Sequence, residues 1–187
     1  MQQRLLELLL EEKNMELKGG LYHQMQIKLT YNSNRIEGSR LSEDQTRYIY
    51  ETNTVNTEPN EAANVDDIIE TVNHFHCFGY MLIHADEELT EELVKEYHGI
   101  LKRNTSDERK EWFRAEDYKA RVNMVGDIRT TAQAKVPAEM KKLIAEYNSK
   151  KRVPYRISLN FITILRVFIL FKMGTAESVV SLCLKSV

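Results

Sequence analysis

Residues 30–51 read TYNSNRIEGSRLSEDQTRYIYE, and this stretch decides how the rest of the chain is interpreted. Ser33 and Glu37 are four positions apart, which places them on one face of a helix. Gly38 follows, and glycine is favoured where a helix stops or where backbones approach closely. We therefore expect a helix over residues 21–36 that presents Glu37 from its end. For an isolated pattern of this kind, a solvated glutamate is the simpler interpretation.

The spacing of Ser33, Glu37 and Gly38 resembles the autoinhibitory segment of Fic-domain nucleotide transferases, and the flanking EGSRLSEDQTRYIYE resembles it too. In that family the glutamate reaches an arginine that otherwise holds the γ-phosphate of ATP. The resemblance therefore implies an inhibitory role for Glu37. It also implies a motif HxFx(D/E)GNGRxxR near the C-terminus, but the sequence contains no such motif, and no histidine follows His98.

The way in which the resemblance stops indicates a shifted reading frame. Residues 168–187 read FILFKMGTAESVVSLCLKSV. If the third base of each codon is joined to the first two of the next, the genetic code permits HPFQDGNGR and then VGRLIMFKEC over this stretch, and FHYHFERI over residues 160–167. Every fixed position of the motif is allowed in one frame. We interpret the chain as a Fic protein whose frame slips near residues 150–154.

Composition is typical of an intracellular globular protein. The chain has 187 residues, of which 42% are hydrophobic and 29% charged, which is ordinary for one domain with a core. A net charge of -2 predicts no nucleic-acid partner. Cys77 and Cys183 form no disulfide framework. Acidic residues are mixed among the N-terminal leucines, unlike the uninterrupted apolar region of a signal peptide, so we expect a cytoplasmic protein.

Residues 157–173, ISLNFITILRVFILFKM, are the one candidate for a membrane segment. A spanning helix needs about 20 mostly apolar residues. This run is shorter and contains Asn160 and Arg166. We therefore expect no membrane partner, and a membrane-tethered protein is the weakest of the functional hypotheses.

Apolar residues recur at helical spacings along most of the chain. Ser42 and Gln45 fit a capping box that opens a short helix. Asn64 fits the cap of another helix, and further helices are expected to begin at Thr90 and Pro137. The first helix is expected to carry a leucine face and to end at a glycine pair: Leu5, Leu6, Leu9, Leu10 and Leu17, then Gly19 and Gly20.

His74 and Cys77 lie three positions apart on one helical face. Zinc needs more converging ligands than these two, and no second cluster supplies them. We therefore predict packed or half-exposed helix side chains and no metal site.

Residues 106–140 break the helical pattern, and a Gly126-Asp127 turn lies between short runs that tolerate β structure. This predicts a β-hairpin. By resemblance, residues 121–136 form the flap that pairs with an extended strand of the target protein. An ordinary surface hairpin is the simpler alternative. The residues assigned to target docking are Val122, Val125, Gly126, Asp127, Ile128, Arg129, Thr130 and Thr131.

The expected fold is all-α, a Fic-like helical bundle with one small β-hairpin flap, incomplete at its C-terminus. Residues 1–60 form the N-terminal inhibitory segment, and residues 61–152 form a partial Fic core. The polar residues 51–64 read as a linker between them. Residues 153–187 are the out-of-frame apolar tail.

The intact family transfers AMP from ATP to a Ser, Thr or Tyr hydroxyl of a protein. Its motif supplies a histidine base, an acidic ligand for Mg²⁺ and a GNGR loop for the phosphates. This sequence supplies none of them. We therefore predict a Fic-family protein adenylyltransferase that is inactive as written, with no catalytic residue and no bound ATP or Mg²⁺. The alternative is a non-catalytic helical module that acts on a Fic core in trans.

The partners follow from the same resemblance. A protein target docks at the flap in the intact family, and the oligomeric state stays open, a homo-oligomer included. Glu37 has lost its arginine in this frame. We expect Glu37 to be solvated or to pair with Arg35 or Arg40, worth at most about 1 kcal/mol.

Overall fold

The computed structural model describes residues 2–57, 59, 62–110, 124–125, 128–129 and 136–149. This part of the chain is helical apart from two short strands, so the all-α prediction is confirmed. The elements are α1 (Gln2–Asn14), α2 (Leu21–Ile36), α3 (Glu43–Thr52), α4 (Val65–Ile83), α5 (Glu91–Lys102), β1 (Met124–Val125), β2 (Ile128–Arg129) and α6 (Val136–Ser149).

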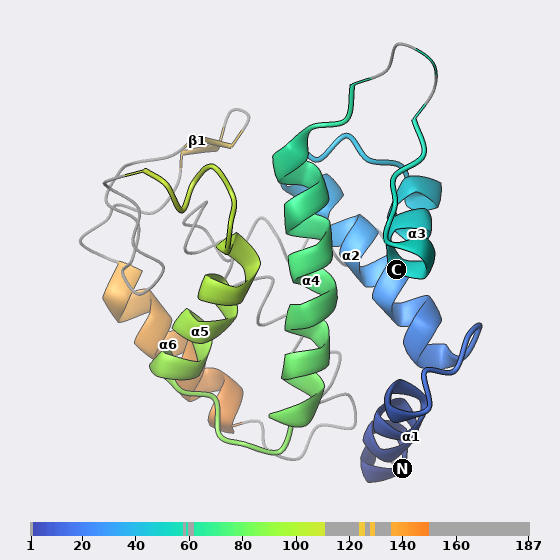
Figure 1. Ribbon diagram of the computed structural model, residues 1–187. Helices are drawn as coiled ribbons and strands as arrows, with labels where there is room; N and C mark the ends of the chain where they lie inside the picture. The colour runs from blue at the N-terminus through green and yellow to red at the C-terminus, as the bar shows by residue number, and fades with distance from the viewer. Residues whose placement is uncertain are drawn as a thin grey trace. The chain divides into compact units, whose positions relative to one another are not determined.

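The chain divides into two compact units, Met1–Ala85 with Ile100–Arg109, and Asp86–Gly99 with Lys110–Val187. In the first unit α2 packs against α1, α3 and α4 (Figure 1), and α3 also packs against α4. The segment between α3 and α4 therefore joins two helices of one unit. The division of the chain at residue 60 stays a prediction.

Helix α1 ends earlier than its leucine pattern predicts. Glu16 adopts a left-handed backbone with φ 49°, and the N–H of Leu17 donates to the carbonyl of Glu12 at 3.0 Å. This is a Schellman-type stop, which glycine usually provides. The prediction that the helix continues through Leu17 to the glycine pair is wrong, because a glutamate takes the left-handed position. Leu17 is 44% exposed beyond the helix end.

Three of the predicted helix starts, at Ser42, Asn64 and Thr90, are confirmed by their caps. Gln45 N–H donates to Ser42 Oγ at 3.1 Å and Ser42 N–H donates to Gln45 Oε1 at 2.9 Å, which completes the capping box of α3. Asn64 Oδ1 accepts from the Asp66 N–H at 2.9 Å at the start of α4. Thr90 Oγ1 accepts from the Leu93 N–H at the start of α5.

The core of the first unit is joined by aromatic contacts. Tyr22 of α2 stacks on Phe78 of α4 at 5.8 Å between ring centroids, and Tyr50 of α3 meets Phe75 edge-on at 4.8 Å. Burial raises the pKa of Tyr50 to about 12. Burial also raises the pKa of the Cys77 thiol. Buried apolar side chains of this unit include Leu6, Leu9, Ile27, Leu41, Ile49, Met81 and Leu82.

The described residues of the second unit include most of α5, the strand pair and α6. Asn148 of α6 exchanges two hydrogen bonds with the backbone of Leu89, which precedes α5, at 3.2 and 2.9 Å. Leu93, Val94 and Tyr97 are buried on α5, and Met140 and Leu143 are buried on α6.

The strands β1 and β2 pair antiparallel, with Met124 opposite Arg129 and Val125 opposite Ile128. The pair lies within the residues for which the sequence predicts a hairpin, and it carries three of the residues assigned to docking. The other five lie outside the described residues: Val122, Gly126, Asp127, Thr130 and Thr131. Docking of a target at this place stays a prediction.

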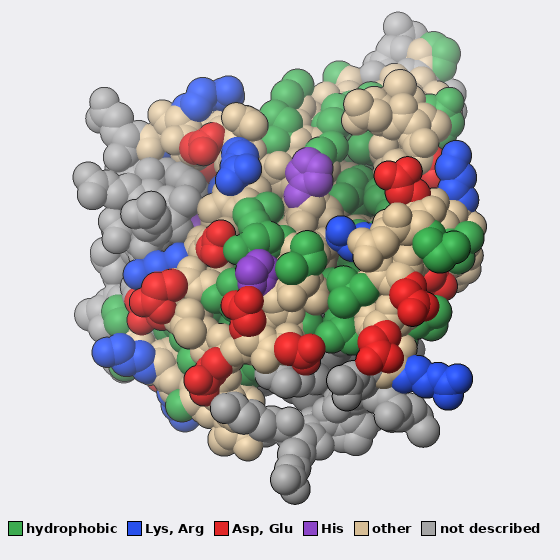
Figure 2. Space-filling view, turned by 60° about the horizontal axis from the view of Figure 1, so that its bottom comes forward, with side chains coloured by type: hydrophobic (Ala, Val, Ile, Leu, Met, Phe, Trp, Pro, Cys, Tyr) green, Lys and Arg blue, Asp and Glu red, His purple; other side chains and the backbone are tan. Residues whose placement is uncertain are grey.

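On the face seen in Figure 2, acidic and basic side chains are mixed with exposed hydrophobic ones. None of the helices in the described part of the chain combines the length and apolar character that crossing a bilayer requires. The apolar run at 157–173 and the whole tail at 153–187 lie outside the described residues.

Candidate functional site

The end of α2 has the geometry that the SxxxEG pattern predicts. Gly38 has φ 97°, and the N–H of Ser39 donates to the carbonyl of Asn34 at 2.9 Å, again a Schellman-type stop. A Cβ added at Gly38 would meet nothing within 4 Å. Gly38 is therefore required for its left-handed backbone and not for a close approach.

Ser33 and Glu37 face the interior of the first unit. Ser33 is fully buried, and the side chain of Glu37 is 4% exposed. Glu37 Oε1 lies 3.9 Å from His74 Nε2, and Glu37 Oε2 lies 3.7 Å from Lys102 Nζ. Both distances exceed those of hydrogen bonds, so these contacts are electrostatic.

Lys102 connects Glu37 to a second carboxylate. Its side chain is 2% exposed, and its ammonium also donates a short hydrogen bond to Glu70 Oε1. We call Glu37, Glu70, His74 and Lys102 the Glu37 cluster. Taking a charge out of water costs several kcal/mol per ion, so such a cluster persists only when opposite charges are held close together.

The expectation that Glu37 is solvated or pairs with Arg35 or Arg40 is wrong. Arg35 donates instead to the hydroxyl of Tyr31, and Arg40 lies exposed beyond the end of α2. The physical reason is the helical period. A residue two positions from Glu37 points to a different face of α2, whereas Ser33, four positions away, shares the buried face with Glu37.

Hydrogen bonds donated by two asparagine side chains hold the elements of the cluster together. Asn34 of α2 donates to Thr71 Oγ1 of α4 at 2.8 Å. Asn73 of α4 donates to the carbonyls of Leu101 and Arg103 at 3.0 and 2.8 Å, which fixes the chain on both sides of Lys102. The ammonium of Lys102 is therefore positioned by neighbours on either side of it.

A further contact lies at the start of α4. Asp66 accepts hydrogen bonds from the N–H of Ser106, at 2.9 Å, and from its hydroxyl. The hydroxyl and then the backbone N–H hold the pKa of Asp66 below its ordinary value. This carboxylate ties the segment after α5 to α4.

Sequence reasoning found Glu37, Ser33 and Gly38 but missed Lys102, Glu70 and His74 as partners of Glu37. The one local signal for Lys102 is its place as the basic residue in the last turn of α5, and this signal does not identify Glu37 as its partner. His74 was predicted to be a packed or half-exposed side chain. Across the residues that the structure describes, no three His, Cys, Asp or Glu side chains gather as metal ligands would.

The described residues do not fit the Mg²⁺ and ATP that the sequence resemblance implies. The Glu37 cluster offers a single ammonium that already contacts two carboxylates. The sequence lacks the glycine-rich loop of the family motif. What the arrangement does is hold together, within the first unit, the end of α2, α4 and the residues around Lys102.

No protein-family model matches this chain, and no curated protein matches it. Solved structures do. A Fic-domain-containing signalling protein from Bacteroides thetaiotaomicron VPI-5482 matches with a TM-score of 0.59 and 16% identity, over 95% of this chain and 78% of that one. A Fic family protein from Desulfovibrio desulfuricans G20 matches with a TM-score of 0.56 and 17% identity, over 90% of this chain and 49% of that one.

At these identities the likeness concerns the fold, which does not by itself specify an activity. The chain spans about half the length of the second of these proteins. Its fold is similar to that of Fic-domain proteins.

Proposed function

We propose that this chain derives from a Fic-type protein adenylyltransferase and keeps the inhibitory segment of such an enzyme without its catalytic centre. The observation that carries the proposal is the burial of Glu37, whose side chain is 4% exposed at the end of α2. Gly38 ends the helix one residue later, as an SxxxEG segment requires.

The burial of Glu37 supports a retained regulatory residue because it is costly for the fold. A helix end needs only the left-handed glycine, and a polar side chain at Glu37 could point to solvent. A buried carboxylate is instead expensive unless a cation lies near it. Lys102 and His74 supply that compensation here, at 3.7 and 3.9 Å. We propose that they hold Glu37 where the motif arginine holds it in the intact family.

The absence of activity follows from the sequence. The chain contains no HxFx(D/E)GNGR motif, and we propose that a slipped frame near residues 150–154 removed it. The trans alternative is less well supported. A module that inserts Glu37 into another protein would first have to take this carboxylate away from Lys102 and His74 of its own chain.

Covalent transfer of AMP tests the proposal. The chain as written, its Glu37→Gly variant and a frame-restored chain with Glu37→Gly are incubated with Mg²⁺ and α-labelled ATP. The frame-restored chain has one base added or removed near codon 150, so that the downstream codons encode HPFQDGNGR. We expect label on protein only with the frame-restored variant.

Labelled protein with the chain as written would refute the loss of the catalytic centre. No label with a folded frame-restored variant would refute the Fic-type activity. Sequencing the DNA over codons 145–170 provides an independent check, because a frame that does not encode the motif removes the basis for the restored chain.

A further inference from the structure

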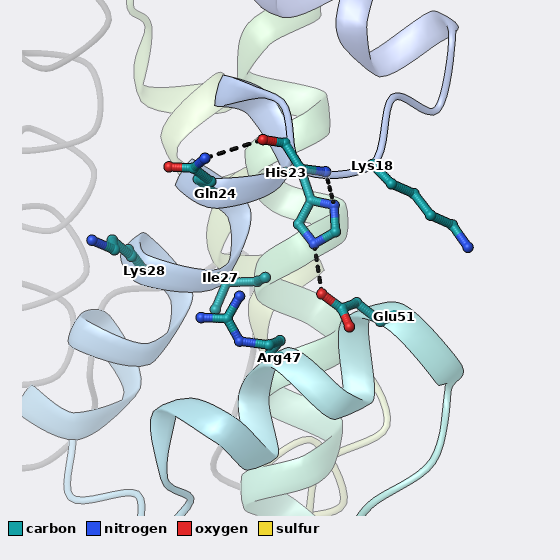
Figure 3. A pocket seen from close by; sticks show the side chains of 8 residues that line it. Lys18, His23, Gln24, Ile27, Lys28, Arg47 and Glu51 are labelled. Atoms are coloured by element: carbon teal, nitrogen blue, oxygen red, sulfur yellow. Dashed lines mark hydrogen bonds and ion pairs between the residues drawn. The ribbon is translucent and has the colours of Figure 1, made fainter.

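A surface hollow lies at the opposite end of α2 from the Glu37 cluster. Its volume is about 490 Å³, within the range of small-molecule sites. It is bordered by the α1–α2 connection, the first turns of α2 and the second half of α3 (Figure 3). The lining residues are Lys18, Gly19, His23, Gln24, Ile27, Lys28, Arg47 and Glu51.

Hydrogen bonds fix the centre of the hollow. The N–H of Gly19 donates to His23 Nδ1 at 3.0 Å, and a backbone N–H can only donate, so Nδ1 is the unprotonated nitrogen. His23 Nε2 therefore carries the hydrogen and donates to Glu51 Oε1 at 2.9 Å. Gln24 Nε2 donates to the carbonyl of Gly19 at 3.1 Å. The walls are thus preorganised before any ligand arrives.

Cations surround this centre. Lys18 and Lys28 form no ion pair among the described residues, and Arg47 makes only a half-exposed contact of 3.6 Å with Glu43, which is worth little. Figure 3 shows Ile27, Lys28 and Arg47 on one side of His23 and Lys18 on the other. Three cationic side chains and one carboxylate, Glu51, thus line the hollow, on a chain whose net charge is negative.

We propose that this hollow binds a small phosphorylated compound. A guanidinium and two ammonium groups match the charge of a phosphate monoester or diphosphate, and the fork of Arg47 suits two phosphate oxygens. Glu51 uses one oxygen for His23, so its other oxygen can accept a hydrogen bond from a hydroxyl or amine of the ligand. Ile27, 1% exposed, belongs to the packed interior beneath the hollow. This site does not depend on the proposed function.

Calorimetric titration of the full chain with pyrophosphate, without Mg²⁺ and at low salt, tests the proposal. We expect binding at one site, weakened about tenfold by Arg47→Ala, as the loss of one charge-assisted contact predicts. Lys28→Ala and Lys18→Ala should weaken binding less, because an ammonium makes no bidentate contact. Glu51→Gln should tighten binding, because it removes the negative charge.

The matched control is Lys141→Ala, which changes the net charge equally at an exposed position of α6. It should leave the affinity unchanged. Equal losses for Arg47→Ala and Lys141→Ala would show attraction to charge in general and overturn the proposal, as would the absence of binding. Chemical shifts of the Gly19 and His23 signals should move during the titration, and saturation without such a movement would also place the ligand elsewhere.

Discussion

The two ends of α2 use the same pair of residue types in opposite settings. At the first end, His23 Nε2 donates to Glu51 at 2.9 Å beside exposed cations. At the last end, His74 Nε2 lies 3.9 Å from Glu37, whose side chain is 4% exposed. The two histidines are buried to a similar degree, at 10% and 11% exposed, whereas the carboxylate is 37% exposed at Glu51 and 4% at Glu37. At the buried end the charges hold elements of the fold together, whereas at the open end they are accessible to a ligand.

The largest expected effect comes from removing the buried cation at the last end of α2. Lys102→Met keeps the length of the side chain and removes the ammonium that contacts Glu37 and Glu70. Removing one partner of a buried pair costs about 3–5 kcal/mol, because a carboxylate then stays out of water without its cation. Urea unfolding at neutral pH, monitored by a spectroscopic signal from the first unit, measures the loss of unfolding free energy.

Arg47→Ala is the control from the open end of α2. Its contact with Glu43 is half-exposed, so its removal should change the unfolding free energy by less than about 1 kcal/mol. Glu37→Gln in the Lys102→Met background should recover part of the loss, because a neutral amide replaces a buried charge. If Lys102→Met and Arg47→Ala lowered the unfolding free energy by the same amount, burial would not distinguish the two ends of α2.

The local parts of this comparison could be predicted from the sequence. The four-residue spacing placed Ser33 and Glu37 on one face, and Gly38 marked the end of α2. Ser42 with Gln45, like Asn64, marked a helix start through a cap that depends only on neighbouring residues. Signals of this kind are confined to a few residues, and the structure confirms them.

The partners of the charged residues could not be predicted. Lys102 meets Glu37 because the last residue of α5 lies close to the end of α2. No local sequence pattern predicts this long-range contact. The hollow has the same origin, since Lys18 and Arg47 come from separate elements. Where one residue departs from its usual conformational preference, even a local prediction fails. Glu16 takes the left-handed position that glycine normally takes, and α1 ends before its leucine pattern does.

The glycines at the two ends of α2 give a smaller expected effect, which depends on backbone conformation alone. Gly38 and Gly19 flank α2 with φ 97° and 76°, and a Cβ at either position meets nothing within 4 Å. The cost of an alanine is therefore conformational, about 1–2 kcal/mol at each position. Thermal unfolding should show similar losses for Gly38→Ala and Gly19→Ala. Gly38→Asn should lose less, because asparagine tolerates the left-handed region.

Gly19→Ala has a second consequence that Gly38→Ala lacks. The N–H of Gly19 fixes the tautomer of His23, so a shift of this backbone should change the ¹⁵N signals of the His23 ring. Unchanged His23 signals in Gly19→Ala would contradict the role of that hydrogen bond in shaping the hollow.

The smallest expected effect lies at the half-buried edge of the first unit, where Asp66 accepts two hydrogen bonds from Ser106. These bonds hold the folded pKa of Asp66 below its ordinary value of 3.8. The stabilisation is therefore present above the unfolded pKa and is lost as the pH falls through the folded pKa. Ser106→Ala removes the hydroxyl, the larger of the two contributions. It should lower the unfolding free energy at pH 7 by less than about 1 kcal/mol, because solvent screens this carboxylate.

The difference between Ser106→Ala and the parent chain should narrow as the pH falls below about 4 and on through the folded pKa of Asp66, below which Asp66 is protonated in both chains. Denaturant unfolding at several pH values measures it, and the Asp66 carboxyl signal reports its pKa directly. A difference that stays constant down to pH 2 would assign the loss to packing of Ser106 and not to the charge of Asp66. A loss as large as that of Lys102→Met would show that an edge carboxylate contributes as much as a buried one, and burial would no longer explain how the two ends of α2 differ.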